Sequence, residues 1–595
     1  MEHTIREEYD VVVVGGGMAG ICAALAAARH GARTVLIHNR PVLGGNASSE
    51  IRMHICGADV HGKRPNARET GIIEELLLEN RRRNPQNSFS VFDTVLWEKV
   101  RFQENLSLYL NTQMLNVVAE EQCVKAVTCL QITTECEFTV GGKIFVDCTG
   151  DGVLAAKAGA LTRMGRESRE EFGESFAPEQ ADGKTMGNTL MFCANDTGKP
   201  CAFEKPEWAY DISEEELKNR QHSADGPERL GVDSGYWWLE LGGTKNVIAD
   251  GEEIRDELLR TLYGIWDHVK NKGDHGAENY ALDWVQFLPG KRESRRIEGD
   301  YILKQQDLEQ AVPFWDTVAY GGWPMDMHPP EGFLYRGEAT CYLHLKQVYS
   351  IPYRCYYAKN LENLMMAGRN ISATHTAFGS VRVMATCAAG GQAVGTAAAM
   401  AVKRGCTPRQ IAGCMEELQQ QLLRDDCYLP NVRNRDSADL ARSAVVEASS
   451  WQQGWEPAQV INGFSRGVGK TTNAWRSENL EACGAWLRLS ISPAEIKEVS
   501  LKFDSDLSKE IMISLSKSVQ RHQVPGVPST LVKDYSLRFL RAGEEIHRMD
   551  ICGNYQRFRT HRLPKTILAD TVELIVHATN GSKAATVYEV RIYGI

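Results

Sequence analysis

Long apolar segments are missing from this sequence of 595 residues. No stretch reaches the roughly 18 apolar residues that a membrane-spanning helix needs. Residues 1–8 are mostly charged or polar and lack the apolar core of a signal peptide. We therefore expect a cytoplasmic protein that has no membrane partner.

Paired cysteines and an excess of positive charge are also missing. The sixteen cysteines include no CxxC pair, and Cys22, Cys148 and Cys387 lie within apolar runs, as reduced and buried thiols do. This usage predicts neither a disulfide framework nor a metal site. The formal net charge is −10, so we expect no nucleic-acid partner, because phosphate binding needs a basic surface.

The sequence does contain a glycine turn between an apolar run, residues 9–14, and an alanine-rich segment, residues 21–28. Gly15 permits the tight turn, Gly17 lets the backbone approach a pyrophosphate, and Gly20 lets the helix pack on the strand. The N-terminus of the helix supplies N–H groups and the positive end of its dipole. The predicted ligand is FAD or NAD(P).

A second buried strand at residues 31–37 completes a βαβ unit of about 30 residues. Such a strand usually ends in an acidic residue that binds the ribose hydroxyls. This sequence has His38, Asn39 and Arg40 there. His38 or Asn39 can still hydrogen-bond a diol, whereas Arg40 would suit the 2′-phosphate of NADP.

Two later segments favour FAD. Residues 144–152 resemble the strand that returns the chain to the FAD domain in flavoproteins of the glutathione-reductase type, and residues 363–370 resemble the last strand, beside the ribityl phosphate. A helix rich in small residues follows at 383–400, and we expect its N-terminal region to face the flavin. The cofactor contacts expected from these segments and from the rest of the domain are Met114, Thr149, Gly150, Asp151, Gly368, Arg369, Gln392 and Ala393.

The chain also resembles a named family, the FAD-dependent oxidoreductases of the FAD_oxidored type, which are common in bacteria and sometimes mislabelled xanthan lyases. The resemblance rests on residues 40–53, 290–296, 320–324 and 368–375 and runs through most of residues 10–400. It implies that FAD is the cofactor. It also implies that a polar, non-acidic residue such as His38 is usual at the end of the second strand in this family. It implies no particular substrate.

The predicted fold class is α/β. We expect a glutathione-reductase-like FAD-binding Rossmann domain at residues 1–160 and 350–440, interrupted by an α+β substrate domain at 161–349. Beyond 441, period-two alternation in short strands, such as 485–491 and 496–503, predicts an antiparallel β-sandwich. Its closing strand resembles galactose-binding-like jelly rolls, which bind carbohydrate or serve only for packing or in a homodimer.

Several residues are candidates for the chemistry at the flavin. Gly45, Asn46 and Ser48 follow the ribose-binding strand and are expected near the pyrophosphate, the ribityl chain or the ring. Arg52 and His54 would share a face in an extended segment. His375 is our first choice for a general base and His54 the second, because histidine titrates near neutral pH. A group of arginines is also suited to clamp a carboxylate: Arg52, Arg292, Arg295 and Arg382.

Three functions remain open at this point. The first is oxidation of a hydroxyl of a carbohydrate or glycoside by hydride transfer to flavin N5, with Trp237, Trp238 or Trp323 stacking on the sugar unless they fill a core. The second is a reductase or dehydrogenase of a carboxylated small molecule, like fumarate reductases. The third is a carbohydrate-binding flavoprotein whose FAD is structural. The first is preferred.

Overall fold

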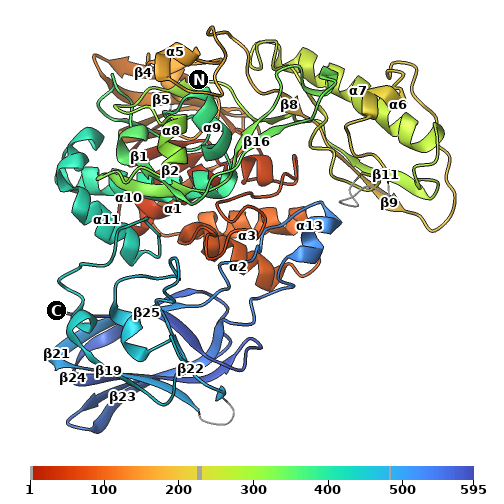
Figure 1. The fold of residues 1–595 in the computed structure, drawn as a ribbon. Helices are drawn as coiled ribbons and strands as arrows, with labels where there is room; N and C mark the ends of the chain where they lie inside the picture. The colour runs from red at the N-terminus through yellow and green to blue at the C-terminus, as the bar shows by residue number, and fades with distance from the viewer. Residues whose placement is uncertain (1–4, 224–230, 481–483) are drawn as a thin grey trace. The chain divides into compact units, whose positions relative to one another are not determined.

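The computed structural model describes residues 5–223, 231–480 and 484–595. The chain divides into two compact units (Figure 1). The first unit comprises Met1–Val60, Asn87–Met415 and Met512–Gln523, and the second comprises His61–Gln86, Glu416–Ile511 and Val524–Ile595. Among the described helices, none combines the length and the apolar character required to cross a bilayer.

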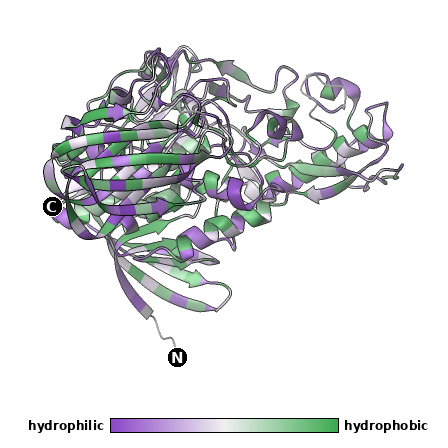
Figure 2. Ribbon diagram, turned by 90° about the horizontal axis from the view of Figure 1, so that it is seen from below, coloured by the Kyte–Doolittle hydropathy of each residue, from purple (hydrophilic) through white to green (hydrophobic). Residues whose placement is uncertain are grey.

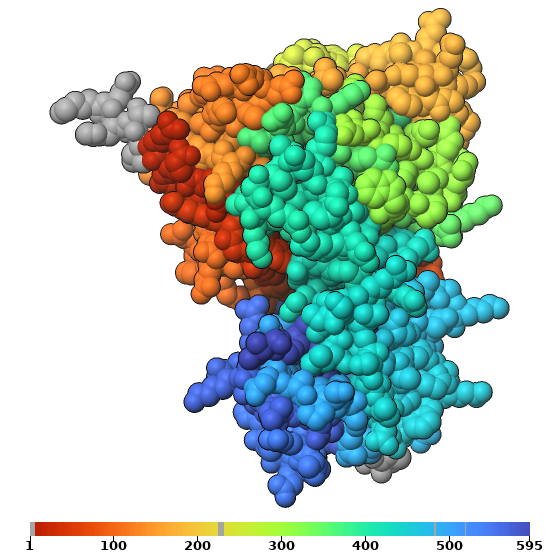
Figure 3. All heavy atoms as spheres, turned by 90° about the vertical axis from the view of Figure 1, so that its left-hand side faces the viewer, coloured from red at the N-terminus to blue at the C-terminus, as the bar shows by residue number. Residues whose placement is uncertain are grey.

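A seven-stranded sheet forms the centre of the first unit. Its order is β3-β2-β1-β6-β5-β4, and β18 pairs with the second half of β6. The strands are β1 (Ile5–Val14), β2 (Thr34–Ile37), β3 (Leu106–Tyr109), β4 (Thr112–Glu120), β5 (Cys123–Gln131), β6 (Cys136–Asp147) and β18 (Leu364–Met366). β1, β2, β3, β6 and β18 pair in parallel, whereas β4 and β5 form an antiparallel extension of β6. This confirms the predicted α/β region with a sheet that contains parallel strands. In Figure 3 the red spheres of the first part of the chain lie beside orange spheres, the colour that includes β6.

Helix α1 (Met18–Arg29) and helix α10 (Met384–Arg404) pack closely on one another. A Cβ added at Gly391 would lie 2.2 Å from the carbonyl oxygen of Ala19, and one at Gly395 would lie 2.1 Å from that of Ala23. Both glycines are therefore required by the close approach of the two helices.

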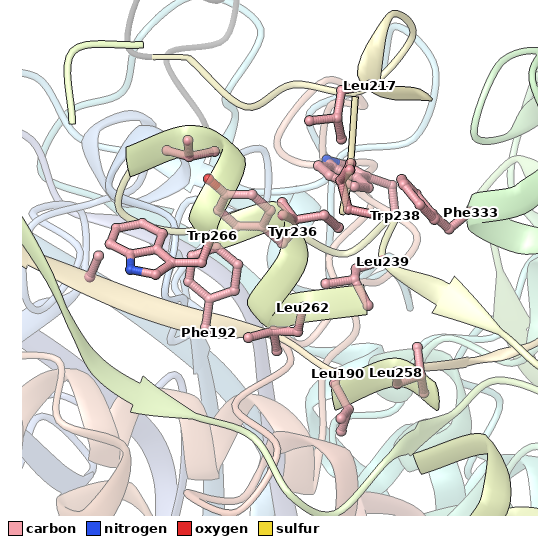
Figure 4. Packing of buried hydrophobic residues seen from close by; sticks show 14 of the residues in the cluster. Leu190, Phe192, Leu217, Tyr236, Trp238, Leu239, Leu258, Leu262, Trp266 and Phe333 are labelled. Atoms are coloured by element: carbon pink, nitrogen blue, oxygen red, sulfur yellow. The ribbon is translucent and has the colours of Figure 1, made fainter. Parts of the chain in front are cut away.

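The inserted region has its own apolar core (Figure 4). Helix α7 (Gly251–Asn271) and the antiparallel pair β9 (Phe192–Asp196) and β11 (Tyr280–Val285) contribute to it. The ring of Phe192 lies 5.3 Å from that of Trp266, measured between centroids. The other strands of this part of the chain are short: β7 (Thr162–Arg163), β8 (Asn188–Thr189), β10 (Glu240–Leu241), β12 (Gly290–Lys291), β13 (Arg296–Ile297), β14 (Thr317–Gly321), β15 (Met325–Met327), β16 (Cys341–Leu343) and β17 (Tyr349–Pro352).

The second unit is built on an antiparallel sheet, as predicted. Its order is β20-β25-β21-β24-β22-β23, with β19 beside β21. The strands are β19 (Val445–Ala448), β20 (Trp475–Arg476), β21 (Ala485–Phe503), β22 (Val532–Arg541), β23 (Glu544–Ile551), β24 (Phe558–Thr579) and β25 (Thr586–Gly594). Hydropathy alternates along these strands (Figure 2), and Tyr535, Leu537 and Phe539 of β22 are fully buried.

One prediction about this sheet was wrong. Residues 485–491 and 496–503 were expected as separate strands, but they form the single strand β21. The register against β24 shifts between Ser490 and Ala494, so the strand is irregular there without ending.

The two units exchange segments, which the sequence did not reveal. Helix α2 (Ile72–Arg83) belongs to the second unit, where the guanidinium of Arg68 pairs with Glu74 at 2.8 Å and donates to the Ser505 carbonyl at 2.8 Å. Conversely, α13 (Lys517–His522) belongs to the first unit. The division that we propose from sequence, with boundaries at 160, 349 and 440, contains neither exchange.

Candidate functional site

A cavity of about 280 Å³ lies at the carboxyl ends of β1, β2 and β6. Ligands of open parallel sheets bind at this edge, where strand ends and helix N-termini meet. The cavity is lined by these residues that the sequence singled out: Gly15, Gly17, His38, Asn39, Gly45, Asn46, Met114, Thr149, Gly150, Asp151, Gly368, Arg369 and Arg382.

The glycine turn at its centre places each glycine for a different reason. Gly15 has φ +109°, and a Cβ there would lie 2.1 Å from the Cys148 carbonyl oxygen. A Cβ at Gly20 would lie 1.8 Å from the carbonyl oxygen of Gly15. A Cβ at Gly17 meets no described protein atom within 4 Å, and Gly17 lines the cavity as the N-cap of α1. The space beside Gly17 and the free N–H groups of α1 fit a pyrophosphate.

His38 fits the ribose end of a dinucleotide. Its Nδ1 accepts a hydrogen bond from the backbone N–H of Gly16 at 3.0 Å, so Nε2 carries the ring proton. Nε2 is buried and finds no acceptor in hydrogen-bond geometry among the described residues. Burial lowers the pKa of His38 to about 4, which keeps the ring neutral. The backbone carbonyl of Val42 interacts with the ring and partly offsets this shift, so a ribose hydroxyl would share the Nε2–H donor with that carbonyl.

Arg40 does not line this cavity. Its guanidinium pairs with Glu50 at 2.7 Å. Because the pair neutralises its charge, Arg40 is poorly placed to select a 2′-phosphate, which favours FAD over NADP.

Asp151 joins two sequence motifs at the cavity wall. Its carboxylate lies 2.5 Å from the guanidinium of Arg369 and 2.7 Å from Nζ of Lys291. Burial alone would raise the pKa of Asp151, but Arg369 and Lys291 outweigh it and hold the pKa well below its usual value. Ser294 Oγ also donates to Asp151 at 2.8 Å, so this network fixes residues 149–151 against residues 290–296.

His375, the first choice for a general base, begins helix α9 (His375–Val381). Its Nδ1 lies 2.9 Å from a carboxylate oxygen of Glu293, whose other oxygen accepts from the backbone N–H of Met186 at 2.9 Å. The backbone N–H of His375 donates to Glu167 at 2.8 Å. The ring is thus oriented by a buried carboxylate. His375 is itself 5% exposed and is not among the described residues that line the cavity.

Arg382 lines the cavity near the N-terminus of α10 and begins a chain of charges that we call the charge network: Arg382, Asp326, His328, Glu240 and Arg292. Successive pairs in this chain lie 3.1, 3.2, 2.8 and 3.3 Å apart. Burial lowers the pKa of His328, but Asp326 and Glu240 outweigh it and raise the pKa above its usual value. Nε of Arg382 is buried without an acceptor in the described part of the chain.

The segment after the second strand differs from its prediction. Arg52 was expected in an extended segment, but it has φ +61° and its N–H donates to the Ser48 carbonyl at 2.8 Å, which closes a turn. Its guanidinium lies 4.3 Å above the ring of Trp284. His54 is half-buried. Neither residue is among the described residues lining the cavity, so a shared face toward substrate is not formed.

Other predicted cofactor contacts also lie off the cavity: Gly20, Arg40, Ser48, Gln392 and Ala393. Helix α10 begins at Met384, and Gln392 is about 12 Å further along its axis. The cavity is instead lined by Met384 and Cys387, which share a face of the first turn, and by Thr112 and Gln113 at the start of β4. Because Met384 and Cys387 are three residues apart, they lie on the same face of the helix, and this spacing could have predicted that both face the cofactor.

The profile of the FAD dependent oxidoreductase family matches residues 10–422, which include every residue that lines the cavity. The chain belongs to this family. FAD is therefore its cofactor, as predicted, and His38, the space at Gly17 and the free N–H groups of α1 fit that group.

Relatives match this flavoprotein over short stretches. The 3-oxosteroid 1-dehydrogenase of Mycolicibacterium smegmatis is 52% identical over 48 residues, which is 8% of this chain and 8% of that protein. The fumarate reductase (cytochrome) of Shewanella frigidimarina is 58% identical over 42 residues, 7% of each chain. Both matches thus cover less than a tenth of the relative.

Solved structures of carbohydrate-binding modules also match. A fucose binding module of Streptococcus pneumoniae is 11% identical, covers 26% of this chain and 98% of that chain, and has a TM-score of 0.20. Chitosan-binding module 1 from Paenibacillus sp. IK-5 is 14% identical, with the same coverage and TM-score. TM-scores this low do not establish a shared function.

Proposed function

We propose that this flavoprotein oxidises a hydroxyl group of an uncharged, polar substrate such as a carbohydrate or glycoside. FAD supplies the hydride acceptor, N5 of the flavin. The observation that carries the proposal is the hydrogen bond of 2.9 Å between His375 and the fully buried Glu293, because oxidation of a hydroxyl group needs a base for the hydroxyl proton.

Glu293 determines which nitrogen of His375 acts. A carboxylate accepts the proton of Nδ1, so Nε2 stays unprotonated and is the atom that removes the hydroxyl proton. Once His375 is protonated, the negative charge of Glu293 stabilises the imidazolium. Glu293 is a positioning residue, and it is held in turn by the N–H of Met186.

The charge network favours an uncharged substrate. Arg382 and Arg292 each have a carboxylate partner, Asp326 and Glu240 respectively. Each guanidinium is therefore already paired within the protein, and a substrate carboxylate would compete with those partners. Nε of Arg382 remains suited to donate to a neutral oxygen. This arrangement gives the carboxylate-clamping alternative less support than the oxidation of a hydroxyl.

To test this, the purified flavoprotein is mixed anaerobically with neutral sugars and polyols. Reduction of the flavin is measured as loss of the absorbance of its oxidised form. We expect bleaching by at least one of these compounds, and a rate roughly 100-fold or more lower in His375→Ala with unchanged flavin content. The rate of flavin reduction should also fall in Glu293→Gln, because a neutral amide no longer stabilises the imidazolium of His375. His344→Ala, at an exposed histidine, is the matched control.

Two outcomes oppose the proposal. If neutral sugars fail to bleach the flavin but unsaturated acids reoxidise the photoreduced protein, the enzyme is a reductase of carboxylated molecules. If neither class exchanges electrons with the flavin, the FAD is structural.

A further inference from the structure

Three histidines and one glutamate converge in the inserted region, away from the residues lining the cofactor cavity. We infer that Glu214, His222, His268 and His275, here called the histidine cluster, bind one Zn²⁺ ion. One potential ligand atom of each residue lies within 4.8 Å of those of the other three. With Zn–N bonds of about 2.0–2.1 Å, tetrahedral ligand atoms lie about 3.3 Å apart. Small side-chain rotations therefore complete the site.

The four residues come from two pairs of neighbouring segments. Glu214 is the first residue of helix α6 (Glu214–Leu217), and His222 follows in the next loop. His268 lies in the last turn of α7, and His275 lies in the loop after it. A shared ion would tie both loops to α7, whose other side carries Trp266 in the apolar core.

Two of the rings are held as metal-binding imidazoles are held. His268 Nδ1 lies 3.0 Å from the carbonyl oxygen of Ile212, and His222 Nδ1 lies 2.6 Å from that of Arg220. Each Nδ1–H donates to a carbonyl, which leaves the lone pair of Nε2 available. Both Nε2 atoms face Glu214, at 2.9 Å for His268 and 3.4 Å for His222.

The third ring is fixed through its other nitrogen. His275 Nε2 lies 2.9 Å from the Lys272 carbonyl and donates to it, so Nδ1 stays unprotonated. The same Nε2 lies 3.8 Å from a Glu214 carboxylate oxygen, which places the ring beside the other ligands.

Charge and access agree with a bound cation. The ring centroids lie 4.8 Å apart for His222 and His275, 5.0 Å for His268 and His275, and 5.7 Å for His222 and His268. Three imidazole rings and one carboxylate at these distances form a donor set for a single dication. The Glu214 side chain is 67% exposed and borders a surface hollow, which gives an ion a path to the site.

The donor set indicates which metal binds. Imidazole nitrogens with one carboxylate oxygen, four ligands in all, are typical of Zn²⁺, and Mg²⁺ or Ca²⁺ prefer sites made of oxygen. Because four protein ligands leave no open position, the ion is structural and takes no part in the flavin chemistry.

The experiment measures zinc and flavin together in the purified holoenzyme by elemental analysis and absorbance. We expect about one zinc per chain, a lower melting temperature after chelation, and recovery when Zn²⁺ is added back. His222→Ala and His268→Ala should lose the zinc and keep the flavin, whereas His344→Ala, at an exposed histidine outside the cluster, should keep both.

A titration with Zn²⁺ against a competing chelator makes the test independent of how the protein was prepared. Wild-type protein freed of metal should bind one ion, and each histidine variant should bind it roughly 100-fold more weakly or worse. Equal binding by wild type and the variants, or no binding by wild type, overturns the inference. If the variants do not fold, the wild-type stoichiometry and the effect of chelation decide alone.

Discussion

The cofactor cavity and the histidine cluster are assembled in different ways. The cavity is built largely from backbone, where strand ends and a glycine turn leave room beside Gly17. The cluster is built from side chains on two loops and two helix ends. Backbone construction imposes short, regular spacings that are visible in a sequence, whereas His222 and His268 are brought together only by the packing of the inserted region.

Substitutions in the glycine turn are expected to have the largest effects, on folding and on FAD binding. Gly20→Val places a side chain against the Gly15 carbonyl and should prevent folding, because that oxygen lies 1.8 Å from the new Cβ. Gly17→Val meets no described protein atom at its Cβ and should fold without FAD. Loss of a ligand present at 1,000 times its Kd removes about 4 kcal/mol of stability. Soluble yield, circular dichroism and the flavin-to-protein ratio measure both effects.

The two variants control for each other, because they introduce the same side chain three residues apart. Full flavin occupancy in Gly17→Val would show that the cofactor does not approach this turn. Equal misfolding of both would show that the space beside Gly17 is needed by the protein itself.

An intermediate effect is expected in the core beneath the histidine cluster. Trp238 is 4% exposed and its ring lies 6.1 Å from that of Phe333, so Trp238→Ala should lower the free energy of unfolding by about 3–5 kcal/mol. Trp237 is half-buried, with its ring 5.8 Å from that of His328, and Trp237→Ala should cost much less. Urea denaturation of the two variants measures the difference.

This pair of variants also separates a core role from sugar stacking. A Trp238→Ala protein with unchanged stability but slower reduction by sugars would contradict the core assignment. The same result for Trp237→Ala would place that ring at the substrate.

The parts of the site that the sequence predicts are those that depend on the ends of strands. Gly15 and His38 follow directly after β1 and β2, Asp151 lies four residues after the end of β6, and parallel strands bring these ends to one edge. Gln392 stays a prediction that the lining of the cavity does not include, because the sequence indicates the start of α10 but not how far the cavity extends along the helix. Arg52 was misplaced because its left-handed backbone, φ +61°, has no signal in the residue types around it.

Long-range exchanges are harder still to predict. The pairing of Arg68 with Glu74 is local, but its hydrogen bond to the Ser505 carbonyl joins residues more than 400 positions apart. Neither composition nor periodicity near Arg68 records that partner. The two-unit division therefore requires the three-dimensional contacts.

The smallest effect concerns the protonation of His38, and its sign follows from the lowered pKa. Burial lowers the pKa of His38 to about 4 in the folded protein, against about 6.5 in the unfolded chain, so the unfolded chain binds the proton first as pH falls. The neutral ring thus contributes stability fully above pH 6.5 and loses about 3 kcal/mol by pH 4. His38→Asn keeps an acceptor for the Gly16 N–H and does not titrate, so its melting temperature should fall less steeply over this range. His344→Asn, at an exposed histidine, should follow the wild type. Identical slopes for His38→Asn and wild type would mean that His38 has the same pKa in the folded protein and in the unfolded chain, which would contradict the lowering by burial.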